Sequence, residues 1–186
     1  PAVAVLSINN EAITAAVEKA NAAVVPFFVF NSLVKLPADN VEVASYIGYD
    51  QEEAGKLCGE EMVARLTKKH DQARGKVIIL EGLPGFHTTA RTKGFLEGLN
   101  LQEHPDIRVE NYPAKWRRDE AKVVIERLLT KDKNIDGIFG CSDAMAQGAA
   151  QALIEAKLHP EVTTIGIDGN PDTIEDVKNG VVTATL

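Results

Sequence analysis

Two side chains of this sequence have the chemistry to hold a hydroxylated small molecule, Asp168 and Arg91. Asp168 ends the apolar run 165–167, where a carboxylate can accept hydrogen bonds from two hydroxyl groups. Arg91 lies one turn into a predicted helix, and its guanidinium offers five donors in a rigid fork that suits adjacent hydroxyls or a carboxylate. Asp168 has the alternative of a turn or cap residue, but Asn170 already fills the cap position, so ligand binding is favoured. Arg91 is equally compatible with an exposed position on its helix.

Further polar or aromatic residues follow predicted strands. Trp116, the only tryptophan, lies in a loop where its ring can cover the C–H groups of a sugar, or alternatively the protein core. Asn31 ends a strand and can both donate and accept hydrogen bonds, although it also suits a turn. Asp143 is the predicted N-cap of the next helix, which leaves Ser142 to point into the crevice.

The elements that position these residues are apolar strands, six of which end in a small polar cluster, with helices between most of them. This alternation predicts an α/β fold with doubly wound parallel sheets. Ligands of such sheets bind in the crevice beyond the carboxyl ends of the strands, so the polar clusters are predicted to converge there. The six strands are predicted near 3–6, 27–31, 76–80, 107–111, 135–140 and 162–167, and two further strands at 41–47 and 181–186. Helices are predicted over 10–23, 50–69, 87–100, 119–131, 143–156 and 171–179.

The predicted elements amount to one complete lobe and part of a second. Residues 50–182 supply enough strands and helices for a complete lobe. Residues 1–48 supply only one helix and about three strands, which is too little to cover both faces of a parallel sheet. This part is therefore predicted to need further chain or a partner. The chain also begins and ends within predicted strands, which indicates a fragment of a longer protein.

The composition excludes several kinds of partner. The 186 residues carry a net charge of −7 with no basic run, which argues against nucleic acid, because phosphate binding needs clustered Lys and Arg. No apolar stretch approaches the roughly 20 residues that span a bilayer. The four histidines show no metal-ligand spacing, and no metal or cofactor is predicted.

No catalytic residues are evident. The turn at 82–85 lacks the Gly-Lys-Ser/Thr of a phosphate loop, and the G-x-S-x-G and G-x-G-x-x-G patterns are absent. Nothing places Ser, His and Asp as a triad, and no two carboxylates suggest an acid and base pair. We therefore predict that the protein is not an enzyme. Cys58 and Cys141 are interpreted as buried free thiols, with a disulfide left open.

The order and spacing of several segments resemble the type I periplasmic sugar-binding proteins, the ribose- and galactose-binding group that serves ABC transporters. The resemblance extends over nearly the whole chain. It is strongest in Ser142-Asp143-Ala144-Met145-Ala146-Gln147-Gly148-Ala149 and in Ile165-Gly166-Ile167-Asp168-Gly169-Asn170-Pro171-Asp172. The segments 11–31, 75–82 and 90–95 add to it.

The resemblance implies a periplasmic-binding-protein-like fold of two lobes joined by crossing strands, with the ligand held between them. By this likeness, residues 1–48 form a partial N-terminal lobe, 49–182 the C-terminal lobe and 183–186 the start of the return crossing. The missing partner of the first lobe is then its own N-terminal segment. The implied ligand-binding residues are Asn31, His87, Arg91, Trp116, Ser142 and Asp168.

Two positions depart from the family pattern. Leu6 stands where several sugar binders carry a ligand asparagine, and Asn31-Ser32 replaces the Asp-Arg pair of ribose binders. The identity of the sugar therefore stays open.

The function implied by the resemblance is capture of a sugar or related polyol between the lobes and its delivery to the membrane subunits of an ABC transporter. Its location would be periplasmic or extracytoplasmic. The alternative is the ligand-sensing domain of a regulator, either a lactose-repressor-like effector domain or the sensor of a membrane receptor, because these share the fold. The Gly169-Asn170-Pro171-Asp172 run resembles transport binders more than repressors.

Overall fold

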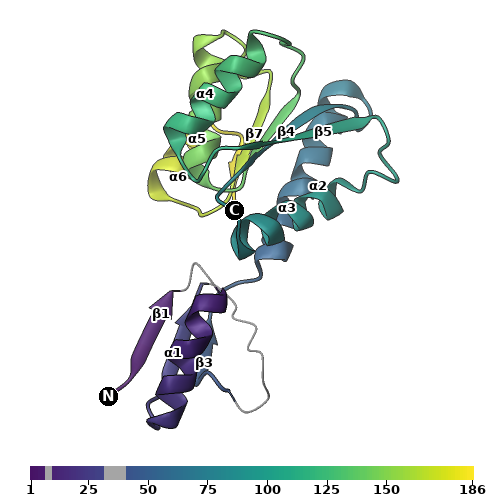
Figure 1. The fold of residues 1–186 in the computed structure, drawn as a ribbon. Helices are drawn as coiled ribbons and strands as arrows, with labels where there is room; N and C mark the ends of the chain where they lie inside the picture. Colours follow the sequence, from purple (N-terminus) through teal and green to yellow (C-terminus); the bar gives the residue numbers. More distant parts are fainter. Residues whose placement is uncertain (7–9, 32–40) are drawn as a thin grey trace. The chain divides into compact units, whose positions relative to one another are not determined.

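The computed structural model describes residues 1–6, 10–31 and 41–186. They divide into an N-terminal unit, residues 1–50 with 85–87, and a C-terminal unit, residues 51–84 with 88–186. Each unit contains one sheet in which every described strand pair is parallel, with helices between the strands. The predicted α/β class with doubly wound parallel sheets is confirmed (Figure 1).

The N-terminal unit is a three-stranded sheet in the order β1-β2-β3, covered on one face by helix α1. The side chains of Val17 and Ala20 on the helix pack against Phe27 and Val29 of the middle strand. The bounds are β1 Val3–Leu6, α1 Asn10–Ala22, β2 Phe27–Phe30 and β3 Ser45–Ile47.

On the opposite face of this sheet, the described residues leave apolar side chains exposed. Side chains alternate along a strand, so Phe30 points away from the helix, and it is paired in register with Leu6 and Ile47. These three apolar residues are 41%, 43% and 68% exposed, respectively. Because parallel sheets are normally buried on both faces, the described part of this unit is an incomplete lobe, as the sequence predicts.

The C-terminal unit is a five-stranded sheet in the order β5-β4-β6-β7-β8. Helices α2 and α3 lie on one side of it and α4 and α5 on the other (Figure 1). One core joins both layers, and within it the rings of Phe95 and Phe139 stack with centroids 4.1 Å apart. The bounds are α2 Gln51–His70, β4 Gly75–Glu81, α3 Phe86–Leu99, β5 Ile107–Pro113, α4 Arg118–Leu129, β6 Gly137–Gly140, α5 Asp143–Glu155, β7 Thr163–Gly166, α6 Pro171–Lys178 and β8 Ala184–Thr185.

Helices α2 and α3 touch backbone to backbone. A Cβ on Gly55 would collide with the carbonyl oxygen of Arg91, and one on Gly94 would collide with that of Glu52. Only glycine permits so close an approach. This contact brings the start of α2 next to the part of α3 that carries Arg91.

Every predicted helix and strand has a counterpart among the described residues, and two strands are much shorter than predicted. The strand predicted over 41–47 is confined to 45–47, because only these residues pair with β2. The terminal strand predicted over 181–186 is confined to 184–185, which pair with the last two residues of β7. The predicted loop at 33–40, with Ser32, and the polar cluster at 7–9 lie outside the described residues.

Candidate functional site

Arg91 is the centre of a hydrogen-bonded cluster in the C-terminal unit. Its side chain is only 5% exposed. Nε donates to Gln51 Oε1 at 2.7 Å, and Nη1 donates to the Cys141 carbonyl oxygen at 2.5 Å and to Asp168 Oδ1 at 3.1 Å. The guanidinium thus joins the start of α2 to the carboxyl ends of β6 and β7. The alternative of an exposed helix arginine is wrong, because Arg91 faces the sheet and α2.

Trp116 lies beside this guanidinium. Its ring centroid is 5.8 Å from Arg91 Cζ, within the range of a cation–π contact. The ring also lies against Gly82, where a Cβ would collide with it, and it is half-buried against the core. The interpretation of the ring as a cover over the core is confirmed. Contact of its other face with a sugar stays a prediction.

Asp168 follows β7 and faces Arg91, with about a third of its side chain exposed, at 33%. Burial raises the pKa of its carboxyl, and the nearby Arg91 offsets this only in part. Its backbone has a φ of 141°, a conformation that costs a non-glycine residue free energy. Asp168 thus lies at the predicted edge of the sheet with a strained backbone. Its charged carboxylate is only partly stabilised by Arg91.

The N-cap of α5 predicted at Asp143 is wrong, and the ligand-binding role of Ser142 stays a prediction. Ser142, not Asp143, occupies the N-cap position of α5, and its side chain makes no capping hydrogen bond. Ser142 is 6% exposed, and its Oγ has no hydrogen-bond partner within the described part of the chain. Asp143 is the first helical residue and is fully buried. Its carboxylate does not cap α5, because it accepts hydrogen bonds from Asn170 N and Thr185 Oγ1.

Asn31 and His87 belong to the N-terminal unit. Asn31 follows β2 with a φ of 67°; its N–H donates to the Ile47 carbonyl oxygen at 2.9 Å, and its own carbonyl oxygen accepts from the Tyr46 hydroxyl at 3.2 Å. His87 is the second residue of α3, with its ring edge-on to Phe86. The structure therefore groups four of the six predicted residues, Arg91, Trp116, Ser142 and Asp168, in one unit, and it places the other two in the other unit.

Two residues of this cluster are absent from the sequence prediction of the site. Gln51, which is 2% exposed, holds Arg91 Nε, and nothing marks it in the sequence beyond its place at a helix start. Asp143 is prominent in the sequence, but local spacing indicates a cap and not a buried acceptor for distant groups.

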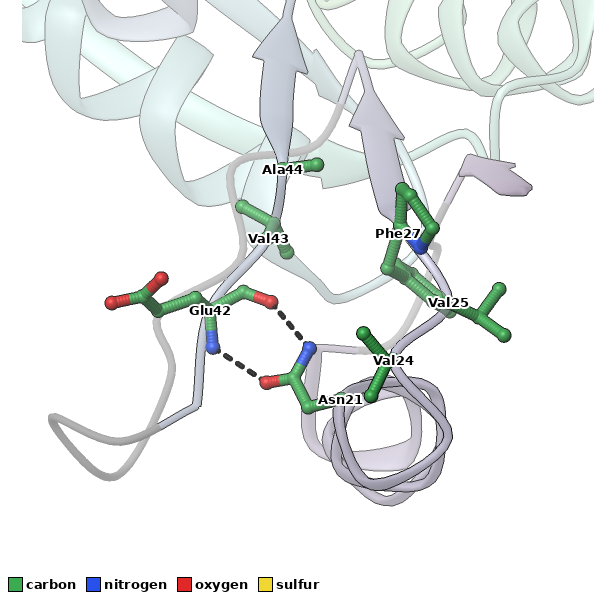
Figure 2. Close-up of a pocket in the computed structure, with 8 residues that line it drawn as sticks. Asn21, Val24, Val25, Phe27, Glu42, Val43 and Ala44 are labelled. Carbon is green, nitrogen blue, oxygen red and sulfur yellow. Dashed lines mark hydrogen bonds between the residues drawn. The ribbon is translucent and has the colours of Figure 1, made fainter. Parts of the chain in front are cut away.

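The larger cavities among the described residues have linings that do not include these side chains. The one in Figure 2 has a volume of about 440 Å³ and lies at the amino end of β2, where the amide of Asn21 makes two 2.8 Å hydrogen bonds with the backbone of Glu42. Ligands of parallel sheets bind at the carboxyl ends, so this cavity is not the predicted site. A second cavity, of about 540 Å³, lies between the ends of β4 and β5 and helix α3, and Arg91, Trp116, Ser142 and Asp168 are not part of its lining.

The cysteines are buried free thiols, as the sequence predicts. Burial raises the pKa of Cys58 to about 12 and that of Cys141 to about 11, so neither is a reactive thiolate near neutral pH. Within residues 1–6, 10–31 and 41–186, no group of three His, Cys, Asp or Glu side chains could hold a metal ion. None of the described helices has the length and apolar character to cross a bilayer.

Comparison with known proteins gives consistent matches. The family described as periplasmic binding protein domain matches residues 1–186. The ribose import binding protein of Salmonella typhimurium strain LT2 is 32% identical over 180 residues, which cover 96% of this chain and 56% of that protein. The xylitol-binding protein of Mycolicibacterium smegmatis is 31% identical over 182 residues, which cover 96% of this chain and 49% of that protein.

Solved structures agree. An ABC transporter periplasmic solute-binding protein from Actinobacillus succinogenes 130z with bound D-allose matches with a TM-score of 0.86 at 32% identity, over 97% of this chain and 63% of that one. A solute-binding protein from Bacillus halodurans with bound myo-inositol matches with a TM-score of 0.83 at 26% identity, over 97% and 60%. The chain thus spans between 49% and 63% of the length of these four relatives. None of the four proteins named is described as a regulator or an enzyme.

Proposed function

We propose a function from the premise that this chain belongs to the periplasmic binding protein family, whose model matches it from residue 1 to residue 186. The protein binds a sugar or related polyol and delivers it to the membrane subunits of an ABC transporter. The observation that carries this proposal is the cluster at the carboxyl ends of the C-terminal sheet: Arg91 held between Asp168 and Cys141, with the ring of Trp116 beside it.

The chemistry of this cluster suits a polyhydroxylated ring. The Asp168 carboxylate accepts hydrogen bonds from hydroxyl groups, and Arg91 donates to hydroxyl oxygens without needing to reorganise, because Gln51 already fixes its Nε. The indole of Trp116 offers an apolar surface to C–H groups. Relatives that bind ribose, xylitol and D-allose support the same class of ligand.

The proposal extends to location, partners and domain organisation. The protein acts in the periplasm or another extracytoplasmic compartment, it catalyses no reaction, and a further N-terminal segment of the whole protein completes the first lobe. The division of the chain near residue 50 supports a partial N-terminal lobe at 1–48 and a C-terminal lobe that begins at 49. In this proposal that lobe ends at 182, and 183–186 form the start of a return crossing. In the structure, residues 184–185 still pair with β7.

The mechanism is closure of two lobes on the ligand. Asn31 of the N-terminal lobe completes the contacts that the other five predicted residues, all within 49–182, make from the C-terminal lobe. A ligand shifts the equilibrium toward the closed form only by its higher affinity for that form, so contacts from both lobes are required. The transporter then recognises the closed form.

The test is a thermal-shift and calorimetric screen of the intact protein against pentoses, hexoses and polyols. Arg91→Ala is expected to weaken binding by about 100-fold or more, because the buried acceptors and the ligand hydroxyls lose their donor. Arg65→Ala is the matched control, since Arg65 is a half-exposed arginine on α2 that pairs with Glu61 at 2.6 Å. Equal ligand responses from Arg91→Ala and the parent protein would refute the site.

A further inference from the structure

The turn that follows Asp168 is held at two consecutive backbone amides. The Asn170 N–H donates to Asp143 Oδ2 at 2.8 Å. The Gly169 N–H donates to Thr185 Oγ1 at 3.2 Å, and that hydroxyl donates in turn to Asp143 Oδ1 at 2.5 Å. A single buried carboxylate therefore fixes both amides, one directly and one through a hydroxyl group.

The conformation that these hydrogen bonds hold is unfavourable on its own. Asp168 has a φ of 141° and Gly169 a φ of 63°. A strained non-glycine residue persists only where its surroundings over-determine it. The Asp168 N–H also donates to the carbonyl oxygen of Leu186, the residue after β8, at 3.0 Å, so Leu186 and Asp143 together keep the backbone in this state. The result is an Asp168 side chain directed at Arg91.

The site of Asp143 is built around its carboxylate. Asp143 is fully buried, and its own N–H donates to the Ile167 carbonyl oxygen at 2.7 Å, which joins α5 to the end of β7. A Cβ on Gly166 would lie 2.5 Å from Asp143 Oδ1, so glycine at this position leaves room for the carboxylate. Gly166 is the register partner of Thr185 in β8. Three strand and helix ends thus meet at one acceptor.

We propose that Asp143, acting through Thr185 and the turn amides, is a positioning residue that sets the orientation of Asp168 for ligand binding. This inference rests on the proposed sugar-binding function and adds to it a residue that does not itself contact ligand. It also makes strand β8 a determinant of affinity, because the Thr185 hydroxyl is one of the two links between Asp143 and the turn.

The first experiment compares Thr185→Val with Thr185→Ser in the intact protein by calorimetry with the sugar that the parent protein binds. Valine keeps the shape of threonine but removes the hydroxyl that Gly169 and Asp143 share, and affinity is expected to fall about tenfold. Serine keeps the hydroxyl and is expected to retain most of the affinity. Asp143→Asn, with a single carbonyl acceptor in place of two carboxylate oxygens, is expected to show a loss similar to that of valine. Equal affinities for the valine and serine variants would overturn the proposal.

A second measurement separates positioning from general stabilisation. In an Asp168→Ala background the side chain to be oriented is gone, so Thr185→Val is expected to cause no further loss of affinity. If the same tenfold loss persists in that background, Thr185 and Asp143 act on the fold as a whole and the proposal is wrong.

A third measurement needs no ligand. Amide hydrogen exchange at Gly169 and Asn170 is expected to be about tenfold or more faster in Thr185→Val and Asp143→Asn than in the parent, while amides within β4 keep their protection. Unchanged exchange at the turn would overturn the positioning role even if sugar binds. Faster exchange in a protein for which no sugar binds would instead uphold the control of the turn by Asp143 and contradict the proposed function.

Discussion

Asp136 and Asp168 lie next to neighbouring strands of the same sheet, but at opposite ends. Asp136 precedes β6 at the amino end, where its carboxylate accepts hydrogen bonds from the Lys76 N–H and Lys69 Nζ, both at 3.0 Å, and lies 2.8 Å from His70 Nε2. Asp168 follows β7 at the carboxyl end, where one cationic side chain, Arg91, bonds to it among the described residues.

The difference appears in the protonation of the two carboxyl groups. Burial raises the pKa of Asp136, but the hydrogen bonds from Lys76, Lys69 and His70 outweigh it and leave the pKa lowered. The pKa of Asp168 is raised, because burial there exceeds the effect of Arg91. The fold thus stabilises the charged form of Asp136 at the amino end of the sheet. At the carboxyl end, the fold does not fully stabilise the charged form of Asp168. A site that must bind hydroxyl groups needs this unused hydrogen-bonding capacity.

The largest effect is expected at the carboxyl end. Asp168→Asn removes the carboxylate acceptor and should lower sugar affinity about 100-fold, measured by calorimetry. The same change should not lower stability near neutral pH. Because the folded pKa is raised, the stability contributed by Asp168 is present below its unfolded pKa and is lost as pH rises through its folded pKa. Asparagine does not titrate and avoids this loss.

The check is urea unfolding of the parent and the variant at several pH values from about 3 to about 7. The parent is expected to become less stable relative to Asp168→Asn as pH rises across this range. The comparison between the two ends fails if the variant is clearly less stable than the parent near pH 7 and still binds sugar normally.

A smaller effect, of opposite kind, is expected at the amino end. Asp136→Asn should lower the free energy of unfolding by about 1 kcal/mol near pH 7, because Lys69 and His70 lose a partly buried charged acceptor. The lowered pKa means that the stability is present above the unfolded pKa and is lost as pH falls through the folded pKa, so the two proteins should converge in acid. Sugar affinity should change little, and a large loss of affinity would show that the two ends are not independent.

The general fold and part of the site are predictable from the sequence for a specific reason. Apolar runs followed by polar residues identify the carboxyl ends of parallel strands. Trp116 and Asp168 lie just beyond such ends, and Arg91 lies on the helix that follows β4. Strand pairing then brings these ends together across large sequence separations. The shortened strand at 45–47 is harder to predict, since its bounds depend on which residues find partners on β2.

Gln51 and Asp143 are not predictable in the same way. Gln51 meets Arg91 because α2 and α3 touch at Gly55, a contact between segments that the local sequence does not relate. The position of Asp143 before a helical stretch indicates an N-cap from local rules, but the amide of Asn170 and the hydroxyl of Thr185 compete successfully for its carboxylate. Whether a carboxylate caps its own helix or bonds to distant groups depends on which donors the tertiary structure brings near it.

The smallest effect is expected from Ser142, and its sign is informative. The buried Ser142 Oγ has no hydrogen-bond partner within the residues that the structure describes, so Ser142→Ala should raise the free energy of unfolding by about 0.5–1 kcal/mol without ligand. If a sugar hydroxyl bonds to this oxygen, the same variant should bind sugar up to about tenfold more weakly. Urea unfolding and calorimetry on one preparation measure both quantities. If the variant is more stable but binds sugar more weakly, Ser142 resembles Asp168, a group that binds ligand and lowers the stability of the fold. Lost stability would instead place it with Asp136, as a group that the fold itself satisfies.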